Sequence, residues 1–195
     1  RITSTVQSRK KMKIAFMGVS GSGKDFLSGY LIKNHNFIRL SFSDQLKRLS
    51  KYIYPWMERD YPPEKKMSPL NIRLPTGEFI NHSPRDIWLN LDNLRKIEEK
   101  IFIRMLAEEM KEIEIKNESK TNIIITDIRS NSEFLWCKEN NFTIVYINRK
   151  NNNYEKYDID KHVIENKQKA DYRFDNDSND LIRFKSFFEE VLCRE

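Results

Sequence analysis

Three of the chain's five glycines, Gly18, Gly21 and Gly23, lie within six residues and directly before Lys24. An apolar run over residues 14–17 precedes them and a helical pattern follows, so residues 18–24 fit the G-x-x-x-x-G-K pattern of a phosphate-binding loop. Glycines let successive backbone N–H groups surround phosphate oxygens, the new helix presents its positive N-terminus, and the lysine reaches the outer phosphates. The spacing predicts a nucleoside triphosphate site. Its candidate binding residues are Gly18, Ser20, Gly21, Ser22, Gly23, Lys24 and Asp25.

Two aspartates are candidate ligands of Mg²⁺. Asp25 stands where a Ser or Thr hydroxyl normally binds the metal, and a carboxylate there could hold Mg²⁺ directly or through a water. Asp127 ends the apolar run of residues 123–126, a position from which a carboxylate orders Mg²⁺ opposite the loop. The alternative for Asp127 is a turn or helix N-cap. Arg129, two positions on, could offer a planar bidentate donor to the transferred phosphoryl group, or could be a surface arginine.

Other polar residues are candidates for binding an acceptor. Ser83 is a predicted N-cap, and Arg85 near the same helix start would combine a guanidinium with the helix dipole to bind a phosphate. A second polar group follows the strand predicted over residues 37–42 and should emerge at the loop's edge of the sheet. The acceptor candidates are Ser43, Asp44, Lys47, Arg73 and Arg85, with Arg73 the weaker of the two arginines.

His162 and Glu165 are spaced by three residues, so a helix would place both side chains on one face. Zinc binding is not indicated, because no second His or Cys pair accompanies them.

Strand and helix signals alternate along the chain, which predicts an α/β fold with three layers. Short apolar runs are typical of parallel strands covered on both faces by helices, so we expect a mostly parallel five-stranded sheet. The predicted strands are residues 13–19, 37–42, 122–127, 142–148 and about 172–174. The predicted helices are residues 24–33, 94–113, 132–140 and 181–192.

The domain organisation follows from composition. All six prolines lie between Pro55 and Pro84 among many aromatic residues, which predicts a lobe over about residues 50–92, inserted into one domain of residues 12–195. Such a lobe would overhang the carboxyl edge of the sheet, where ligands bind. The polar segment of about residues 149–169 is a predicted lid. Residues 1–11 form a polar, basic tail that we expect to lie outside the fold.

Charge and cysteine content narrow the class of protein. The formal net charge of +6 suits a polyanionic partner, but basic and acidic residues are interleaved, so we expect no stable nucleic-acid binding. Cys137 and Cys193 form no C-x-x-C pair, which gives no sign of a metal site or disulfide framework. We find no apolar stretch that approaches a membrane span and no signal-like core, so we expect no membrane association and a cytoplasmic location.

Together these pieces resemble the deoxynucleoside monophosphate kinases of tailed bacteriophages, a branch of the P-loop NMP kinase-like proteins. The resemblance spans most of residues 12–193. It is carried by the loop ending in Gly23-Lys24-Asp25, by Ser43-Asp44-x-x-Lys47, Ser83-Pro84-Arg85, Asp127-x-Arg129 and His162-x-x-Glu165, and by the closing run Asp175-Asn176-Asp177-Ser178.

The resemblance implies transfer of the γ-phosphoryl group of ATP, with Mg²⁺, to a deoxynucleoside monophosphate, in the host cytoplasm if the protein is phage-encoded. It implies that Gly21, Gly23 and Lys24 hold the β- and γ-phosphates and that Asp25 and Asp127 hold Mg²⁺. Arg149, the only arginine of the lid, would contact the nucleotide. Arg85 and Arg129 would bind the acceptor and the transition-state charge, and Ser43, Asp44, Lys47, Arg73, His162 and Glu165 are further substrate-binding candidates.

Two other classes of function stay open. One is a P-loop kinase with another phosphorylated acceptor, such as phosphomevalonate or dephospho-coenzyme A; the aromatics of the lobe favour stacking on a base, but could simply pack a small core. The other is a nucleotide-switched binding protein, although residues 166–169 read Asn-Lys-Gln-Lys and lack the aspartate of a guanine-reading Asn-Lys-x-Asp motif. The base preference and a homodimeric state also stay open.

Overall fold

The computed structural model describes residues 11–117, 121–150 and 160–194. Contacts divide the chain into two compact units, residues 1–40 with 109–195, and residues 41–108. Most of the predicted tail and the centre of the predicted lid, residues 151–159, lie outside the described residues.

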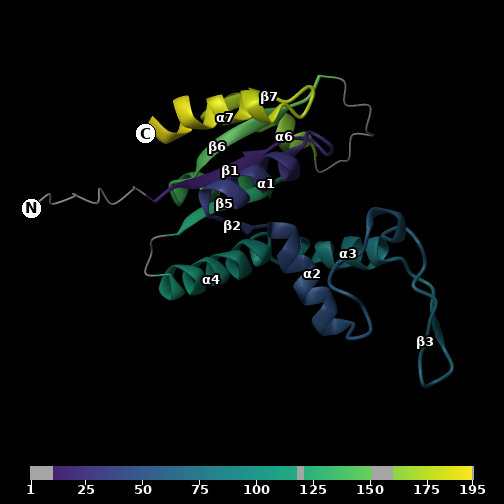
Figure 1. Ribbon diagram of the computed structural model, residues 1–195. Coiled ribbons are helices and arrows are strands. Elements are labelled where there is room, and N and C mark those ends of the chain that lie inside the picture. The colour runs from purple at the N-terminus through teal and green to yellow at the C-terminus, as the bar shows by residue number, and fades with distance from the viewer. Residues whose placement is uncertain (1–10, 118–120, 151–159, 195) are drawn as a thin grey trace, which may run out of the picture. The chain divides into compact units, whose positions relative to one another are not determined.

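The first unit is built on a five-stranded parallel sheet with the strand order β2-β5-β1-β6-β7, as Figure 1 shows. The five strands confirm the predicted sheet. They are β1 Lys13–Met17, β2 Phe37–Leu40, β5 Asn122–Ile128, β6 Thr143–Asn148 and β7 Tyr172–Asp175. β1 lies at the centre, so the loop that follows it leaves from the middle of the sheet's carboxyl edge. This is the edge at which open α/β sheets bind ligands.

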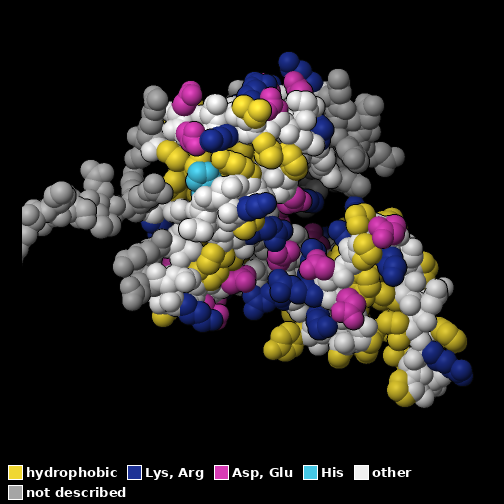
Figure 2. All heavy atoms as spheres, in the orientation of Figure 1, with side chains coloured by type: hydrophobic (Ala, Val, Ile, Leu, Met, Phe, Trp, Pro, Cys, Tyr) yellow, Lys and Arg dark blue, Asp and Glu magenta, His cyan; other side chains and the backbone are white. Residues whose placement is uncertain are grey.

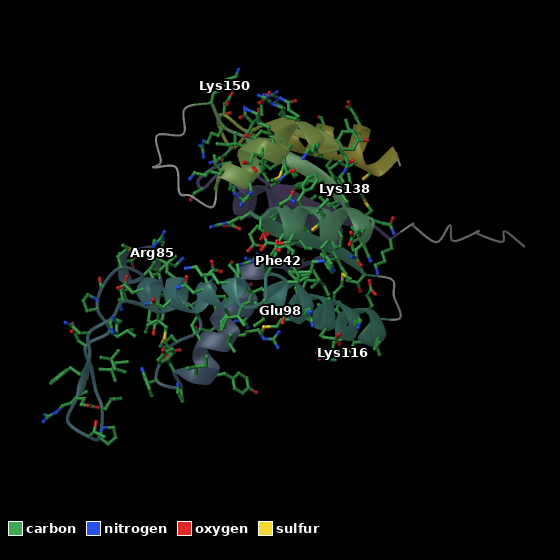
Figure 3. The ribbon with its side chains drawn as sticks, turned by 180° about the vertical axis from the view of Figure 1, so that it is seen from behind. Phe42, Arg85, Glu98, Lys116, Lys138 and Lys150 are labelled. Atoms are coloured by element: carbon green, nitrogen blue, oxygen red, sulfur yellow. The ribbon has the colours of Figure 1, made fainter. Side chains whose placement is uncertain are left out.

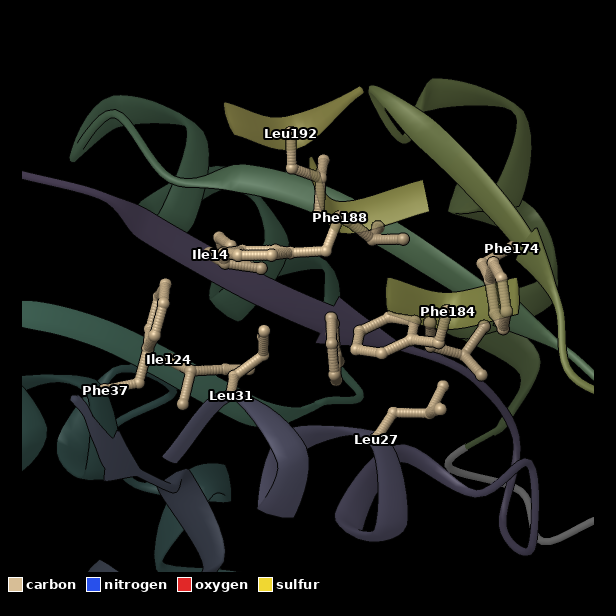
Figure 4. Close-up of a cluster of buried hydrophobic side chains, with 12 residues drawn as sticks. Ile14, Leu27, Leu31, Phe37, Ile124, Phe174, Phe184, Phe188 and Leu192 are labelled. Atoms are coloured by element: carbon tan, nitrogen blue, oxygen red, sulfur yellow. The ribbon is translucent and has the colours of Figure 1, made fainter. Parts of the chain in front are cut away.

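One face of the sheet is covered by α1 (Lys24–His35) and α7 (Leu181–Glu190). Alternate strand residues such as Ile14 and Ile124 point to this face and pack with side chains of both helices, as Figure 4 shows. Phe16 belongs to the same buried cluster. The ring of Phe184 meets that of Phe16 edge-on, with centroids 6.1 Å apart. Burial of each such side chain stabilises the fold by about 1.5–3 kcal/mol, so this cluster fixes α1 and the loop before it.

The other face carries α5 (Asn131–Glu139), which packs on β6, and α6 (Asp160–Asn166), which packs on α5. The unit therefore has three layers, as predicted. The 3₁₀ helices η3 (Lys167–Lys169) and η4 (Leu192–Arg194) follow α6 and α7.

A bulge interrupts the pairing of β1 with β5. Ala15 pairs with Ile125 and Met17 with Ile128, so Thr126 and Asp127 together oppose the single residue between Ala15 and Met17. Bulges re-aim side chains and are common beside active sites. Here the bulge lies in the last residues of β5 before the edge of the sheet, and it contains Asp127.

The second unit contains helices, a small hairpin and its own core. Its elements are α2 (Phe42–Ile53), η1 (Pro63–Lys65), β3 (Ile72–Arg73), β4 (Phe79–Ile80), α3 (Pro84–Asp92) and η2 (Asn93–Lys96), followed by the start of α4 (Ile101–Lys116). Met57, Ile87 and Trp88 are buried at its centre. The Trp88 indole N–H donates to Ser50 Oγ at 3.0 Å, which satisfies the polar end of the ring. Residues 50–92, assigned from sequence to a lobe, fall within this unit.

The aromatic residues of this unit divide between core and surface. Tyr54 and Tyr61 pack against the buried cluster, whereas Tyr52 is 89% exposed and Phe79 65% exposed. Figure 2 shows hydrophobic side chains at the surface around the β3–β4 hairpin. Part of the aromatic content is therefore explained by a small core.

Several predicted elements differ in extent from the structure. The strand predicted over residues 13–19 ends at Met17. The strand predicted over residues 37–42 ends at Leu40, because the Ser41 hydroxyl accepts the Asp44 N–H and starts α2. The helix predicted over residues 94–113 begins only at Ile101. Its apolar stripe breaks at Ile97, which is 85% exposed. Residues 93–96 form a 3₁₀ turn instead, in which Arg95 Nε donates to Asp92 Oδ1 at 2.8 Å.

Within the described residues, no helix combines the length and apolar character needed to cross a membrane.

Candidate functional site: a phosphate-binding loop at the sheet edge

The glycines of the loop are required for two different reasons. Gly21 has φ 77° and Gly23 has φ 88°, in the left-handed region that side-chain-bearing residues rarely adopt. Gly18 is needed for space, since an added Cβ would lie 2.5 Å from the carbonyl oxygen of Ile147. The loop backbone thus packs directly against the end of β6, and its course is fixed by sterics.

The N-terminus of α1 differs from those of its neighbours. The helices α2, α3, α5 and α7 each begin with a side chain that accepts an N–H of the first turn, namely Ser41, Ser83, Ser130 and Asp180. In contrast, α1 begins at Gly23, which has no side chain to do this. The first N–H groups of a helix need acceptors, and together with the dipole they suit an anion. The start of α1 therefore fits a phosphate group.

Lys24 is buried, with 7% of its surface exposed, and its ammonium lies inside the loop. Nζ donates to the carbonyl oxygens of Gly18 at 2.7 Å and Val19 at 3.0 Å. The N–H of Ser22 also donates to Val19 O, which closes the turn. Nζ also donates to Ser22 Oγ at 3.4 Å, so its three donors lie among the loop atoms that would surround a phosphate.

Two side chains from outside the loop bind its remaining carbonyl oxygens. Arg149 Nη1 donates to Gly21 O at 3.2 Å, so this predicted nucleotide-binding residue does lie against the loop. Asn176 Nδ2 donates to Ser22 O at 2.9 Å and was not among the predicted site residues. The available signal was the polar run Asp175-Asn176-Asp177-Ser178, which directly follows β7.

Asp127 is 6% exposed and lies in the bulge near the end of β5. The next residue, Ile128, pairs with Met17, which immediately precedes Gly18, so Asp127 lies at the sheet edge beside the start of the loop. The alternative role of Asp127 as a helix cap is wrong, because α5 is capped by Ser130. Arg129 is half-buried between β5 and α5, and its backbone N–H donates to Glu133 Oε2 at 2.8 Å.

Cys137 of α5 lies close to these carboxylates. Burial raises the pKa of its thiol well above the usual range, and the negative charges of Glu133 and Asp127 raise this pKa further. The thiol therefore stays protonated at neutral pH, and nucleophilic chemistry by Cys137 is not indicated.

The metal candidates are compatible with Mg²⁺ held mainly by a nucleotide. Asp25 is exposed in the first turn of α1, and Asp127 is buried at the sheet edge. The described residues contain no group of three or more His, Cys, Asp or Glu side chains that could hold a metal by themselves. Mg²⁺ commonly uses one or two carboxylates, several waters and substrate phosphates, so two carboxylates fit this ion.

The helix α2 of the second unit carries three of the acceptor candidates. Ser43 shares a hydrogen bond with the cap residue Ser41 at 2.9 Å. Lys47 Nζ lies 2.7 Å from Asp60 Oδ1 and 3.4 Å from Asp44 Oδ1, so it has partners within its own unit. The bond from Lys47 also lowers the pKa of Asp60.

Arg85 lies in the first turn of α3 and is half-buried (Figure 3). The predicted N-cap Ser83 is confirmed: its hydroxyl accepts the Asp86 N–H at 3.1 Å, and the Asp86 carboxylate completes a capping box. Arg73 is exposed in the hairpin, with its guanidinium 5.9 Å from the centre of the Phe79 ring. Both arginines belong to the second unit.

His162 and Glu165 lie on one face of α6, as their spacing predicts. His162 Nδ1 is 3.2 Å from Glu165 Oε2, and both side chains are about half exposed or more, at 49% and 66%. The first unit thus brings together the loop, Asp127 and Arg149, while Ser43, Asp44, Lys47, Arg73 and Arg85 lie in the second.

Comparison with known proteins bears on the fold. No protein-family model matches the chain, and no curated protein sequence matches it. TT1252 from Thermus thermophilus is 14% identical over 94% of this chain and 97% of its own, with a TM-score of 0.54. A dephospho-CoA kinase from Campylobacter jejuni is 14% identical over 92% of this chain and 94% of its own, with a TM-score of 0.49. The likeness to TT1252 shows that the chain has a known α/β fold, a parallel sheet between helices.

Proposed function

We propose that this protein is a P-loop kinase that transfers the γ-phosphoryl group of ATP to a small phosphorylated acceptor. The observation that carries the proposal is the loop of residues 18–24, which leaves the central strand, buries Lys24 and opens into a helix with no side-chain cap. Such a loop binds phosphates through backbone N–H groups and a lysine. The buried carboxylate of Asp127 beside the loop adds the second feature that this chemistry uses.

The favoured acceptor is a deoxynucleoside 5′-monophosphate. This choice is supported by the sequence resemblance, in which Gly-Lys-Asp, Asp-x-Arg and His-x-x-Glu occur in this order. It is also supported by a separate unit of residues 41–108 that carries Arg85 in the first turn of α3, a guanidinium that could bind an acceptor phosphate. In this proposal that unit is the acceptor-binding lobe and residues 149–169 form the lid.

Phosphoryl transfer depends mostly on positioning and charge neutralisation. The N–H groups at Gly21 and Gly23 and the Lys24 ammonium would hold the β- and γ-phosphates, while Asp25 and Asp127 would hold the ion with its waters. Mg²⁺, when bound, neutralises charge on the phosphate oxygens. An acceptor phosphate oxygen attacks the γ-phosphorus in line, and ADP leaves.

Arg129 would neutralise charge on the transferred group, and Arg85 would orient the acceptor phosphate. Lid closure would exclude water, which would otherwise accept the phosphoryl group. His162 and Glu165 are exposed on α6 and would act, if at all, on bound substrate only after such closure.

The deciding experiment measures ADP release from ATP and Mg²⁺ with each deoxynucleoside monophosphate, and separately with ribonucleotides, phosphomevalonate, dephospho-coenzyme A and no acceptor. Stimulation by deoxynucleotides supports the full proposal and ranks the bases. Stimulation by another acceptor keeps the kinase and rejects the deoxynucleotide acceptor. No stimulation by any of them, with ATP bound, favours a nucleotide-switched binding protein.

A further inference from the structure

Asn176 is a buried side chain with no role in the chemistry described so far. It is 1% exposed and follows the last residue of β7. Its backbone N–H donates to Asn148 O at 2.7 Å, which fixes the residue to the end of β6. Its side-chain amide then points to the phosphate loop, where Nδ2 donates to Ser22 O at 2.9 Å and to Asn179 Oδ1 at 3.2 Å.

We propose that Asn176 is a positioning residue that orients the peptide between Ser22 and Gly23 for phosphate binding, an inference that rests on the proposed function. In a planar trans peptide the C=O and N–H groups point in opposite directions. Since Asn176 holds the Ser22 carbonyl, the N–H of Gly23 must point away from Asn176. A fixed donor needs no reorganisation when an anion binds, which is the advantage of a preorganised site.

The contact is too close for any residue other than glycine. An added Cβ at Gly23 would lie 2.2 Å from Asn176 Nδ2 and 3.0 Å from Asn179 Oδ1. Asn176 therefore packs on the loop at the residue that starts α1. Residue 23 must therefore be glycine partly because of this contact with the segment after β7, which lies more than 150 residues away in sequence.

The orientation of the Asn176 amide also argues for a role at the loop. Oδ1 is buried and, among the described residues, has no hydrogen-bond partner. Leaving a buried acceptor unpaired carries a free-energy cost. If the amide were reversed, Oδ1 would face the carbonyl oxygen of Ser22. In the observed orientation the donor Nδ2 faces that oxygen.

The segments that follow β6 and β7 are joined at the same place. Asn148 Nδ2 donates to Asp175 Oδ1 at 2.6 Å, and the Lys150 N–H donates to Asp177 Oδ1 at 3.0 Å. Arg149, which lies between Asn148 and Lys150, binds Gly21 O. Each segment therefore supplies one donor to adjacent carbonyl oxygens of the loop, with Asn176 the buried one.

The test measures ATP affinity by calorimetry in the full chain, for wild type, Asn176→Ala and Asn176→Asp, after circular dichroism shows that each is folded. We expect Asn176→Ala to weaken ATP binding by about tenfold, as for loss of one well-placed hydrogen bond. The KM for the acceptor should stay within about twofold, because the effect is confined to the loop.

Asn122→Ala is the matched control. The Asn122 side chain also forms hydrogen bonds to main-chain atoms: it accepts the Met12 N–H at 3.0 Å and donates to His35 O at 3.1 Å. These bonds lie at the opposite edge of the sheet. We expect Asn122→Ala to lower thermal stability and to leave ATP affinity within about twofold of wild type. Equal losses of ATP affinity in Asn176→Ala and Asn122→Ala would mean that the effect is only structural, and would overturn the inference.

Asn176→Asp removes the amide donor but keeps the shape of the side chain. It therefore separates the loss of the hydrogen bond from a loss of packing, and it can be used if Asn176→Ala does not fold. Ionised, its two oxygens face the Ser22 carbonyl and cannot donate; protonated, its O–H can donate. At about pH 8, where an aspartate is ionised, Asn176→Asp should therefore bind ATP about tenfold more weakly than wild type. An ATP affinity of Asn176→Asp within about twofold of wild type, with wild type binding ATP, overturns the role of Asn176 alone. A wild-type chain that does not bind ATP overturns the proposed function as well.

Discussion

Replacing Lys24 by methionine is the most direct test of the loop chemistry. Methionine keeps an unbranched apolar stem of similar length and removes the ammonium that donates to Gly18 O and Val19 O. Two consequences are expected. The transition state loses its lysine contact with the phosphates, and the loop loses two charge-assisted hydrogen bonds that hold it closed.

The two effects differ in size and can be measured separately. Loss of one charge-stabilising group typically costs about 10³-fold in turnover, which is about 4 kcal/mol at 1.4 kcal/mol for each factor of ten. The change in folding free energy should be smaller, about 1–3 kcal/mol, because burial of an ammonium has its own cost that methionine removes. A coupled assay of ADP release reports the first effect, and urea unfolding reports the second.

The control is Lys13→Met, at the start of β1, the end of that strand opposite the loop. Lys13 Nζ lies 3.4 Å from Glu114 Oε1, and both side chains are partly exposed, so the pair should contribute at most about 1 kcal/mol to folding and nothing to turnover. Turnover of Lys24→Met within about threefold of wild type would refute the assignment of Lys24. An equal loss in both variants would show that the assay reports stability instead of chemistry.

Three further predictions concern the scaffold. Gly23→Ala forces a side chain into φ 88° and a steric clash, so the urea-unfolding free energy should fall by about 2 kcal/mol or more. Ser50→Ala leaves the buried Trp88 N–H without its acceptor and should lower the unfolding free energy of its unit by about 1–3 kcal/mol, followed by tryptophan fluorescence. The bond from the Asn148 amide lowers the pKa of Asp175, so its stabilising contribution is present above about pH 4 and is lost as the pH falls through the lower folded pKa. In Asn148→Ala that pKa should rise towards its usual value, as a carboxyl NMR titration would report.

Each of these expectations has a contrary result. An unchanged unfolding midpoint in Gly23→Ala would mean that the loop relaxes away from its left-handed conformation. Wild-type stability in Ser50→Ala would mean that water replaces the serine at the indole N–H of Trp88. An unshifted Asp175 titration in Asn148→Ala would mean that the neighbouring guanidinium alone accounts for the low pKa.

The features that sequence predicts well are those coded by local residue patterns. All five strands of the sheet were predicted, and the clearest were the apolar runs of β5 and β6, because parallel strands covered on both faces need apolar side chains at nearly every position. The spacing of Gly21, Gly23 and Lys24 predicted the loop, because positive φ angles and a helix start have strong residue preferences. Ser83 was recognisable as a cap for the same reason.

The errors arose where local features interrupted a pattern that apolar spacing alone would continue. Residues 94–113 have a continuous helical stripe, but residues 93–96, with the bond between Arg95 and Asp92, form a 3₁₀ turn and α4 begins only at Ile101. The strand before α2 was predicted too long because Phe42 is apolar, whereas the cap of Ser41 starts the helix there. The spacing of apolar residues gives no sign of a side chain that forms a hydrogen bond to a nearby residue.

The sequence by itself determined the order of strands and helices, the position of the loop and the identity of Lys24, because each depends on residues that are neighbours along the chain. Only the tertiary structure decided that a bulge holds Asp127 beside the loop, and that Arg149 and Asn176 bind the loop's carbonyl oxygens. Those contacts join residues more than 100 positions apart. They exist because parallel pairing brings the carboxyl ends of β1, β5, β6 and β7 to one edge, a juxtaposition that no local pattern encodes.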